Sequence, residues 1–370
     1  MTTDHANSSL VERDKITPMG AVAALYGEGE TDAARAVVAS LSRRVFGAPP
    51  PRPSGFVRCA AARLVWRLMQ GTTRTEMRPG PDGQQVVVFR NRILERSGHP
   101  YAATLLEPSR ADTQDFVEGG DPMNALYMML SPEIRRQAGT WDHIMLDSVQ
   151  ARDVQLRFVW ETRYSHDSAA ARLARGEPVR LKAVAAGAGL SMALVLDRLL
   201  RDGHDQALIS ATISDREANN VAKATRLLGK LSSTGPLLDS GRVRALTEDI
   251  LAPTDDHPND VITMMGLLEY FPGHTFTTTE RHLGHPEPEG PPYAEDVVRN
   301  VAAMTATGGS LVTNTFRLIG AVRIMEVFGK KFRYRGRAEM QRLLATSGFV
   351  PAGQHQSGKV FDVEVFEKRV

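Results

Sequence analysis

The second half of the chain consists of short apolar runs separated by amphipathic segments. The runs 181–186, 207–213 and 260–265 are almost wholly apolar, as are strands buried on both faces of a parallel sheet. Between the first two runs, leucines recur at helical spacing over 192–202, and this segment stops at Gly203. Such alternation of strand and helix predicts an α/β domain built on a doubly wound parallel sheet.

The same pattern continues to the C-terminus and assigns residues 151–370 to one domain. We expect further strands at 242–246, 308–314 and 359–369, the last alternating like an edge strand, and helices at 294–305 and 337–347. A helix is also expected before the first strand. Its arginines, Arg152, Arg157, Arg163 and Arg172, are interpreted mainly as structural or solvated.

The first 150 residues follow a different pattern. Residues 1–15 are polar and predict a disordered leader, whereas 16–150 predict a mainly helical extension. Its expected elements are helices at 31–44, 55–70 and 122–136 and a short strand at 85–89. The extension is expected either to cover a substrate as a lid or to form a homodimer.

The most informative local feature is the glycine pair after the first apolar strand, in Ala186-Gly187-Ala188-Gly189. Two glycines permit a tight turn and let a ligand approach bare backbone. Ser191 is expected to cap the following helix. Asp215, with Arg216 beside it, follows the second strand, where a carboxylate can accept both ribose hydroxyls of an adenosine. This order predicts a site for an adenine nucleoside derivative.

A glycine pair with Met192 in place of a third glycine, followed by an acid, resembles the first two motifs of class I S-adenosylmethionine-dependent methyltransferases. The resemblance continues in Glu248 and Asp249, at the family's contact to the adenine amine, and in Met265, where the fourth strand faces the transferred methyl group. It implies a seven-stranded Rossmann-like methyltransferase sheet, S-adenosyl-L-methionine as cofactor, and methyl transfer to a small molecule of specialised metabolism.

The first motif departs from the family pattern. The family commonly has an acidic residue before the first glycine, which helps to hold the ammonium of the methionine moiety, but this chain has Ala185-Ala186 there. Arg163 or Tyr164, from the segment before the first strand, is expected to act at the methionine end instead.

Methyl transfer from a sulfonium needs mainly orientation of donor and acceptor, and a general base only when the acceptor loses a proton early. Glu269, Tyr270 and His274 follow the fourth strand and are the candidates for such a base. His282 and His285 have a spacing that could hold a metal, but without a helical H-E-x-x-H motif we interpret them as surface histidines and expect no metal.

Composition bears on three questions: nucleic acid as a partner, membrane-spanning segments and disulfide bonds. The 370 residues include 45 basic and 43 acidic side chains, interspersed, so no tract indicates nucleic acid as a partner. No apolar run reaches the length of about 18 residues that spans a bilayer. Cys59 is the one cysteine, which excludes a disulfide within the chain and favours the cytoplasm.

Three alternatives remain open at this point. A methyltransferase-like cyclase would let the cofactor's own amine attack its γ-carbon, giving azetidine-2-carboxylate and methylthioadenosine. A non-catalytic scaffold would bind the cofactor without turnover. A nicotinamide oxidoreductase would use the same sheet with a dinucleotide.

Overall fold

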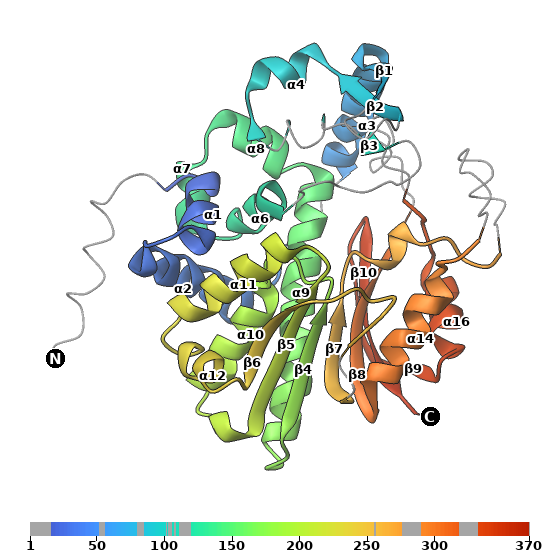
Figure 1. Cartoon of the computed structure of the whole chain (residues 1–370). Coiled ribbons are helices and arrows are strands. Elements are labelled where there is room, and N and C mark those ends of the chain that lie inside the picture. Colours follow the sequence, from blue (N-terminus) through green and yellow to red (C-terminus); the bar gives the residue numbers. More distant parts are fainter. Residues whose placement is uncertain are drawn as a thin grey trace.

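The computed structural model describes residues 16–51, 56–79, 85–100, 102, 106, 109–110, 120–254, 257–275, 290–317 and 332–369 (Figure 1). The leader predicted at 1–15, His282 and His285 lie outside the described residues.

The core of the molecule is a seven-stranded sheet with the order β6-β5-β4-β7-β8-β10-β9. The strands are β4 (Val179–Val184), β5 (Ile209–Asp215), β6 (Val243–Thr247), β7 (Asn259–Met264), β8 (Thr305–Phe316), β9 (Phe349–Ser357) and β10 (Phe361–Lys368). The pairs β6-β5, β5-β4, β4-β7 and β7-β8 are parallel, whereas β10 is antiparallel to both β8 and β9. This topology confirms the predicted Rossmann-like methyltransferase sheet. The chain moves outward on both sides of β4, which makes the β4/β7 boundary the switch point of the sheet.

Helices cover both faces of this sheet (Figure 1). They are α9 (Val149–Leu173), α10 (Leu190–Arg201) and α11 (Ala218–Lys230) on one face, with the short α12 (Gly235–Asp239), and α14 (Ala294–Met304) and α16 (Arg337–Ala345) on the other. Each layer buries its own apolar cluster against the strands. Helix α9 contacts β4, β7, β8 and β10, so one helix crosses the middle of the sheet and can present side chains to several strand ends.

Two predictions about the sheet and its turns were wrong. The expected cap, Ser191, lies inside α10, where its hydroxyl is 3.1 Å from that of Thr162, and Gly189 occupies the N-cap without a side-chain hydrogen bond. The strand expected at the edge, β10, is interior, because β9 pairs along its other side and both of its faces are covered. The polar residues that suggested an edge, such as Glu364, are instead buried and paired, here with Arg337 at 2.6 Å.

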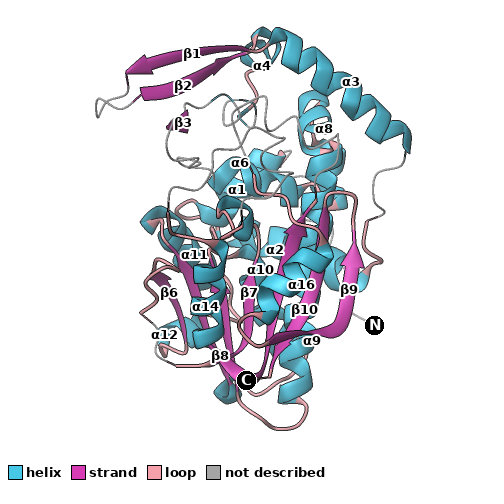
Figure 2. Ribbon diagram, turned by 90° about the vertical axis from the view of Figure 1, so that its right-hand side faces the viewer, coloured by secondary structure: helices cyan, strands magenta, loops and turns pink. Residues whose placement is uncertain are grey.

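The extension is mainly helical, as predicted, and carries a small antiparallel sheet (Figure 2). Its elements are α1 (Pro18–Tyr26), α2 (Thr31–Gly47), α3 (Phe56–Thr72), β1 (Arg74–Pro79), β2 (Gln85–Arg90), α4 (Arg92–Ser97), β3 (Ser109–Arg110), α6 (Gly120–Met128), α7 (Pro132–Gln137) and α8 (Thr140–Leu146). The helix expected at 122–136 is two helices, because Ser131 caps α7 and Pro132 begins it. None of the described helices combines the length and the apolar character needed to span a bilayer.

Helices α1 and α2 pack on the seven-stranded sheet domain through the end of α11. Lys230 is buried, and its Nζ donates hydrogen bonds to the carbonyl oxygens of Ala24 at 2.8 Å and Gly27 at 2.5 Å. These carbonyls lie at the C-terminal end of α1, where a cation is favoured. Arg226 donates in the same way to the carbonyl of Tyr26 at 2.8 Å.

Lys230→Met is expected to lower the free energy of unfolding by about 1.5–3 kcal/mol, because two buried carbonyls lose a charged donor. Urea unfolding at pH 7 would measure the loss. The matched control is Lys359→Met, whose side chain is exposed and whose replacement should change stability by less than about 0.5 kcal/mol. Equal stability of the two variants would show that Lys230 does not hold α1.

Candidate functional site

The turn after β4 exposes backbone at the switch point of the sheet. Ala185, Gly187 and Gly189 have φ angles of +50°, +55° and +71°. A left-handed alanine is strained, and such strain is typical of functional sites. A Cβ on Gly187 would meet no heavy atom within 4 Å, whereas one on Gly189 would lie 3.1 Å from side-chain atoms of Ala224 and Ile213. Gly187 therefore leaves open space above the turn, and Gly189 allows close packing behind it.

Asp215 joins this turn to the end of β5. Its Oδ2 accepts a hydrogen bond from the Gly187 N–H at 2.7 Å, and its Oδ1 accepts from the Glu217 N–H at 2.9 Å and from Asn220 Nδ2 at 3.2 Å. A carboxylate has about four acceptor positions, so these three bonds fix its orientation without exhausting it. The neighbouring Arg216 is exposed and pairs with Glu217 at 3.3 Å, at the surface.

The two acids after β6 have different surroundings. Glu248 Oε2 lies 2.8 Å from Lys182 Nζ, both side chains being at most 1% exposed, and Oε1 accepts from the Thr254 N–H at 2.9 Å. Burial raises the pKa of Glu248, but the hydrogen bonds from Lys182, Thr254 and Ser214 and the charge of Lys182 together outweigh it and hold the pKa below its usual value. Asp249 is exposed, and its Oδ1 accepts from the Leu251 N–H at 2.9 Å. Of the pair, Asp249 has the more accessible carboxylate.

The structure places Arg163 and Tyr164 in contacts away from the glycine turn. Arg163 Nε donates to the carbonyl of Val45 at 2.5 Å, and its guanidinium also bonds the carbonyl of Ala48, which fixes the end of α2. Tyr164 packs against the main core, and it hydrogen-bonds Gln356 of β9 while burial raises its pKa.

A different face of α9 lies over the site. Arg157 is 8% exposed, its guanidinium carbon is 4.7 Å from the centre of the Phe361 ring, and its Nη1 is 4.0 Å from Glu269 Oε1. A Cβ on Gly266, just past β7, would come within 2.9 Å of the same nitrogen. One turn further along α9, Glu161 hydrogen-bonds Ser191 in the first turn of α10. Burial raises the pKa of Glu161 to about 7, although Arg157 opposes the shift.

The extension contributes to this cluster through Tyr127 of α6. Its ring stacks on Phe158 with 4.2 Å between centroids, and its hydroxyl hydrogen-bonds Arg157. Burial raises the pKa of Tyr127, so the phenol is neutral at physiological pH. The cluster therefore joins the extension, α9 and the end of β7.

The three candidate bases are not brought together. Glu269, in the short 3-10 turn Leu268–Tyr270, is buried and faces Arg157, and burial raises its pKa against the effects of Arg157, Arg335 and Asn314. Tyr270 is 39% exposed, with its ring edge-on to Phe332. His274 is exposed and lies against Tyr293 with 4.3 Å between ring centroids.

A hydrogen bond to β8 fixes the backbone just past the end of β7. Asn314 of β8 accepts a hydrogen bond from the Gly266 N–H at 2.7 Å, and Met265 packs partly buried on the main core. Sequence reasoning identified Met265 and Glu269 but missed Arg157 and Glu161. The sequence signal that could have identified them is the spacing of Arg157 and Glu161. They are opposite charges four residues apart inside an otherwise buried stretch of α9.

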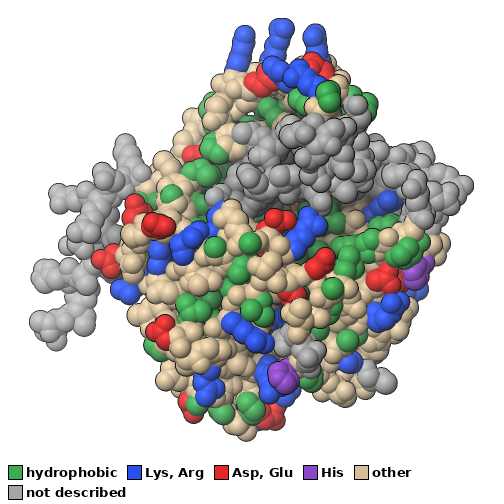
Figure 3. Space-filling model, viewed as in Figure 1, with side chains coloured by type: hydrophobic (Ala, Val, Ile, Leu, Met, Phe, Trp, Pro, Cys, Tyr) green, Lys and Arg blue, Asp and Glu red, His purple; other side chains and the backbone are tan. Residues whose placement is uncertain are grey.

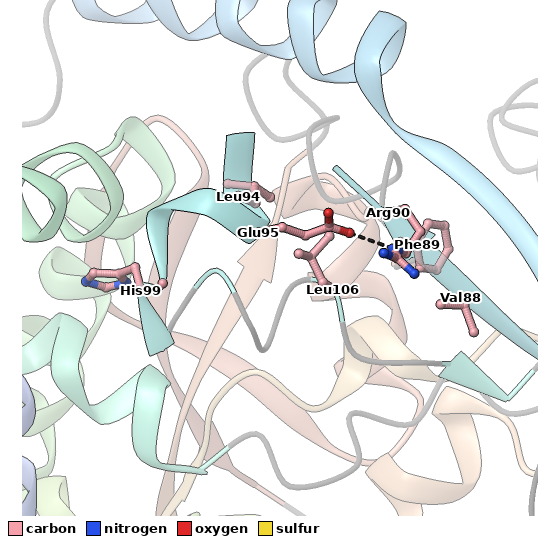
Figure 4. Close-up of a pocket in the computed structure, with 8 residues that line it drawn as sticks. Val88, Phe89, Arg90, Leu94, Glu95, His99 and Leu106 are labelled. Carbon is pink, nitrogen blue, oxygen red and sulfur yellow. Dashed lines mark hydrogen bonds and ion pairs between the residues drawn. The ribbon is translucent and has the colours of Figure 1, made fainter. Parts of the chain in front are cut away.

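A separate cavity of about 490 Å³ lies within the extension (Figure 4). Phe89, Leu94 and Leu106 form its apolar lining, and Arg90 pairs with Glu95 at 2.6 Å along its side. Its lining residues all come from the extension, so this cavity is distinct from the site at the strand ends. On the face shown in Figure 3, acidic and basic side chains of the sheet domain are interspersed rather than gathered by sign.

No protein-family model and no curated protein matches the sequence. Similar solved structures include a magnesium protoporphyrin IX methyltransferase from Synechocystis PCC 6803 with bound S-adenosylmethionine, 14% identical, which aligns over 60% of this chain and 83% of its own with a TM-score of 0.38. The CurJ carbon methyltransferase is 15% identical and aligns over 96% and 100% of the two chains with a TM-score of 0.43. A possible exported protein from Bordetella parapertussis is 13% identical and aligns over 92% and 97% with a TM-score of 0.46. By its own strand order, the chain has the class I S-adenosylmethionine-dependent methyltransferase fold.

Proposed function

We propose that this protein is an S-adenosylmethionine-dependent methyltransferase that acts on a small molecule. The observation that carries the proposal is the hydrogen bond from the Gly187 N–H to Asp215 Oδ2, at 2.7 Å. It lies at the switch point of the sheet. It brings open backbone and a carboxylate side by side, which supports a site for an adenosine.

The residues present fit the adenosine part of this cofactor. The open space above Gly187 accommodates a close ligand, Asp215 would hold the ribose hydroxyls, and the exposed Asp249 would face the adenine amine. A dinucleotide fits less well. Its pyrophosphate approaches the helix start over a third glycine, but Met192 occupies that position and is buried in the first turn of α10.

The reaction chemistry follows from the end of β7. S-adenosylmethionine, when bound, supplies a methyl group on a positively charged sulfur. Gly266 and the bond from Asn314 fix the backbone there, which favours alignment of donor and acceptor. Glu269 is our candidate to accept the proton of a hydroxyl or amine acceptor on its carboxylate, since it follows the end of β7 and burial raises its pKa. Tyr270 and His274 are proposed only as parts of the acceptor's surroundings.

The proposed partner is a small-molecule acceptor, and the proposed location of the protein is the cytoplasm. The near balance of 45 basic against 43 acidic residues supports a substrate other than nucleic acid, and the solitary cysteine of the sequence supports a reducing compartment. The hydrogen bond between the Tyr127 hydroxyl and Arg157 supports a role of the extension as a lid over the site.

Asp215→Asn is expected to weaken binding of S-adenosylhomocysteine by about 10- to 100-fold, because the ribose loses a charged acceptor and the Gly187 N–H faces an amide donor. Isothermal titration calorimetry would measure it. Glu177→Asn, at an exposed site beyond α9, is the control and should bind as the wild type does. Unchanged affinity in Asp215→Asn would remove Asp215 from the site.

Product analysis decides between the enzyme classes. Purified protein is incubated with S-adenosylmethionine, with and without cell extract, and the released nucleoside is identified by mass spectrometry. S-adenosylhomocysteine that requires extract would support transfer to an external acceptor. Methylthioadenosine formed without extract would replace this proposal by the cyclase, and binding without any product in either sample would replace it by the scaffold.

A further inference from the structure

The turn after β4 lacks an acidic side chain. Its residues before Gly187 are Ala185 and Ala186, which have no side-chain group that could receive a cation. The methionine part of S-adenosylmethionine carries an α-ammonium, and a cation taken out of water needs a charged or strongly polar partner. If the proposed function holds, this partner must come from another element.

Helix α9 brings a carboxylate to the same place. Glu161 hydrogen-bonds Ser191, two residues after Gly189, and the Ser191 hydroxyl is also 3.1 Å from that of Thr162. The start of α10, two residues after the glycine turn, is therefore in direct contact with this part of α9. One turn before Glu161, Arg157 reaches the backbone of Gly266 past β7. This face of α9 thus extends between the glycine turn and the strand end that faces the reacting group.

The charges around Glu161 leave it short of positive partners. Arg157 is the cation beside it, and the same guanidinium lies 4.0 Å from Glu269 and hydrogen-bonds Tyr127. Glu269 has a second cation nearby in Arg335, whose guanidinium also bonds the carbonyl of Leu268 at 2.6 Å. Two carboxylates share Arg157, and Glu161 is the one on the side of the glycine turn. A partly buried carboxylate that shares its cation with another acid is less costly when a positive ligand lies beside it.

We propose that the carboxylate of Glu161 receives the α-ammonium of S-adenosylmethionine, in place of an acid in the glycine turn. This inference rests on the proposed function. It assigns the methionine end of the cofactor to α9, while the adenosine end stays with Gly187 and Asp215.

The test uses three unreactive probes that share the adenosine. S-adenosylhomocysteine has both the ammonium and the carboxylate, its decarboxylated analogue keeps the ammonium alone, and methylthioadenosine has neither. Calorimetric titration at pH 8 compares the wild type with Glu161→Gln, which keeps shape and removes charge. We expect the first two probes to bind about 10- to 100-fold more weakly to the variant and methylthioadenosine to bind equally to both proteins.

The control is Asp167→Asn, which removes an exposed acid from the same helix and should leave all three affinities unchanged. Equal weakening of all three probes by Glu161→Gln would overturn the inference, because it would show a general structural effect, and so would unchanged binding of the two ammonium probes. Failure of the wild type to bind any probe would instead reject the proposed function itself. Glu161→Asp should partly restore the two ammonium probes, since it returns the charge on a shorter side chain.

Discussion

Glu248→Gln is expected to lower the free energy of unfolding by about 3–5 kcal/mol, the largest effect predicted for this chain. The variant leaves the Lys182 ammonium, which is 0% exposed, without the carboxylate that lies 2.8 Å from it. The loss comes mainly from the cost of keeping the Lys182 ammonium buried without its negatively charged partner. Urea unfolding at pH 7, followed by circular dichroism, would measure it.

The paired replacement provides the control. In Lys182→Met combined with Glu248→Leu neither charge remains, so most of the lost stability should return. The exposed neighbour variant Asp249→Asn should stay within about 0.5 kcal/mol of the wild type. A loss below about 1 kcal/mol in Glu248→Gln would mean that solvent or a ligand reaches the Glu248 carboxylate. That result would support Glu248 as a contact to the adenine amine.

Glu161→Gln is expected to have the opposite effect on the ligand-free protein and to stabilise it by about 1–3 kcal/mol at pH 8. Burial raises the pKa of Glu161 from 4.5 to about 7, so the folded state binds the proton more tightly than the unfolded state. The stability that this proton provides is complete below about pH 4.5 and is lost as the pH rises to about 7. Above that range the wild type bears the full cost of a buried carboxylate, and a neutral glutamine does not.

Urea unfolding at pH 5 and pH 8 would test whether Glu161→Gln raises or lowers the free energy of unfolding. The difference between Glu161→Gln and the wild type should be large at pH 8 and small at pH 5, whereas Asp167→Asn should show little change between the two. A variant that is less stable than the wild type at pH 8 would mean that the pairing of Glu161 with Arg157 outweighs burial. The expected combination, a more stable protein with weaker ligand binding, is typical of residues kept for function rather than stability.

Much of the fold could be predicted from local pattern. Local pattern located six of the seven strands, all but β9, within a few residues. Continuous apolar runs located β4, β5 and β7, because strands buried on both faces need such sequence. The glycine pair and Asp215 were located equally well, since a tight turn and a strand-end acid depend on neighbours in sequence. The boundaries were less accurate. Strand β4 ends at Val184 because Ala185 already adopts a left-handed conformation, which its side chain does not indicate.

The sequence by itself determined the class of sheet, the position of the glycine turn and the acid beside it. The tertiary structure alone decided which charged residues meet. Arg157 was indistinguishable from its solvated neighbours until α9 was laid across the sheet, and the burial of Glu248 against Lys182 was not visible in the sequence. The physical reason is that the energy of a charge depends on burial and on partners distant in the chain, whereas turns and strands depend on residues next to one another.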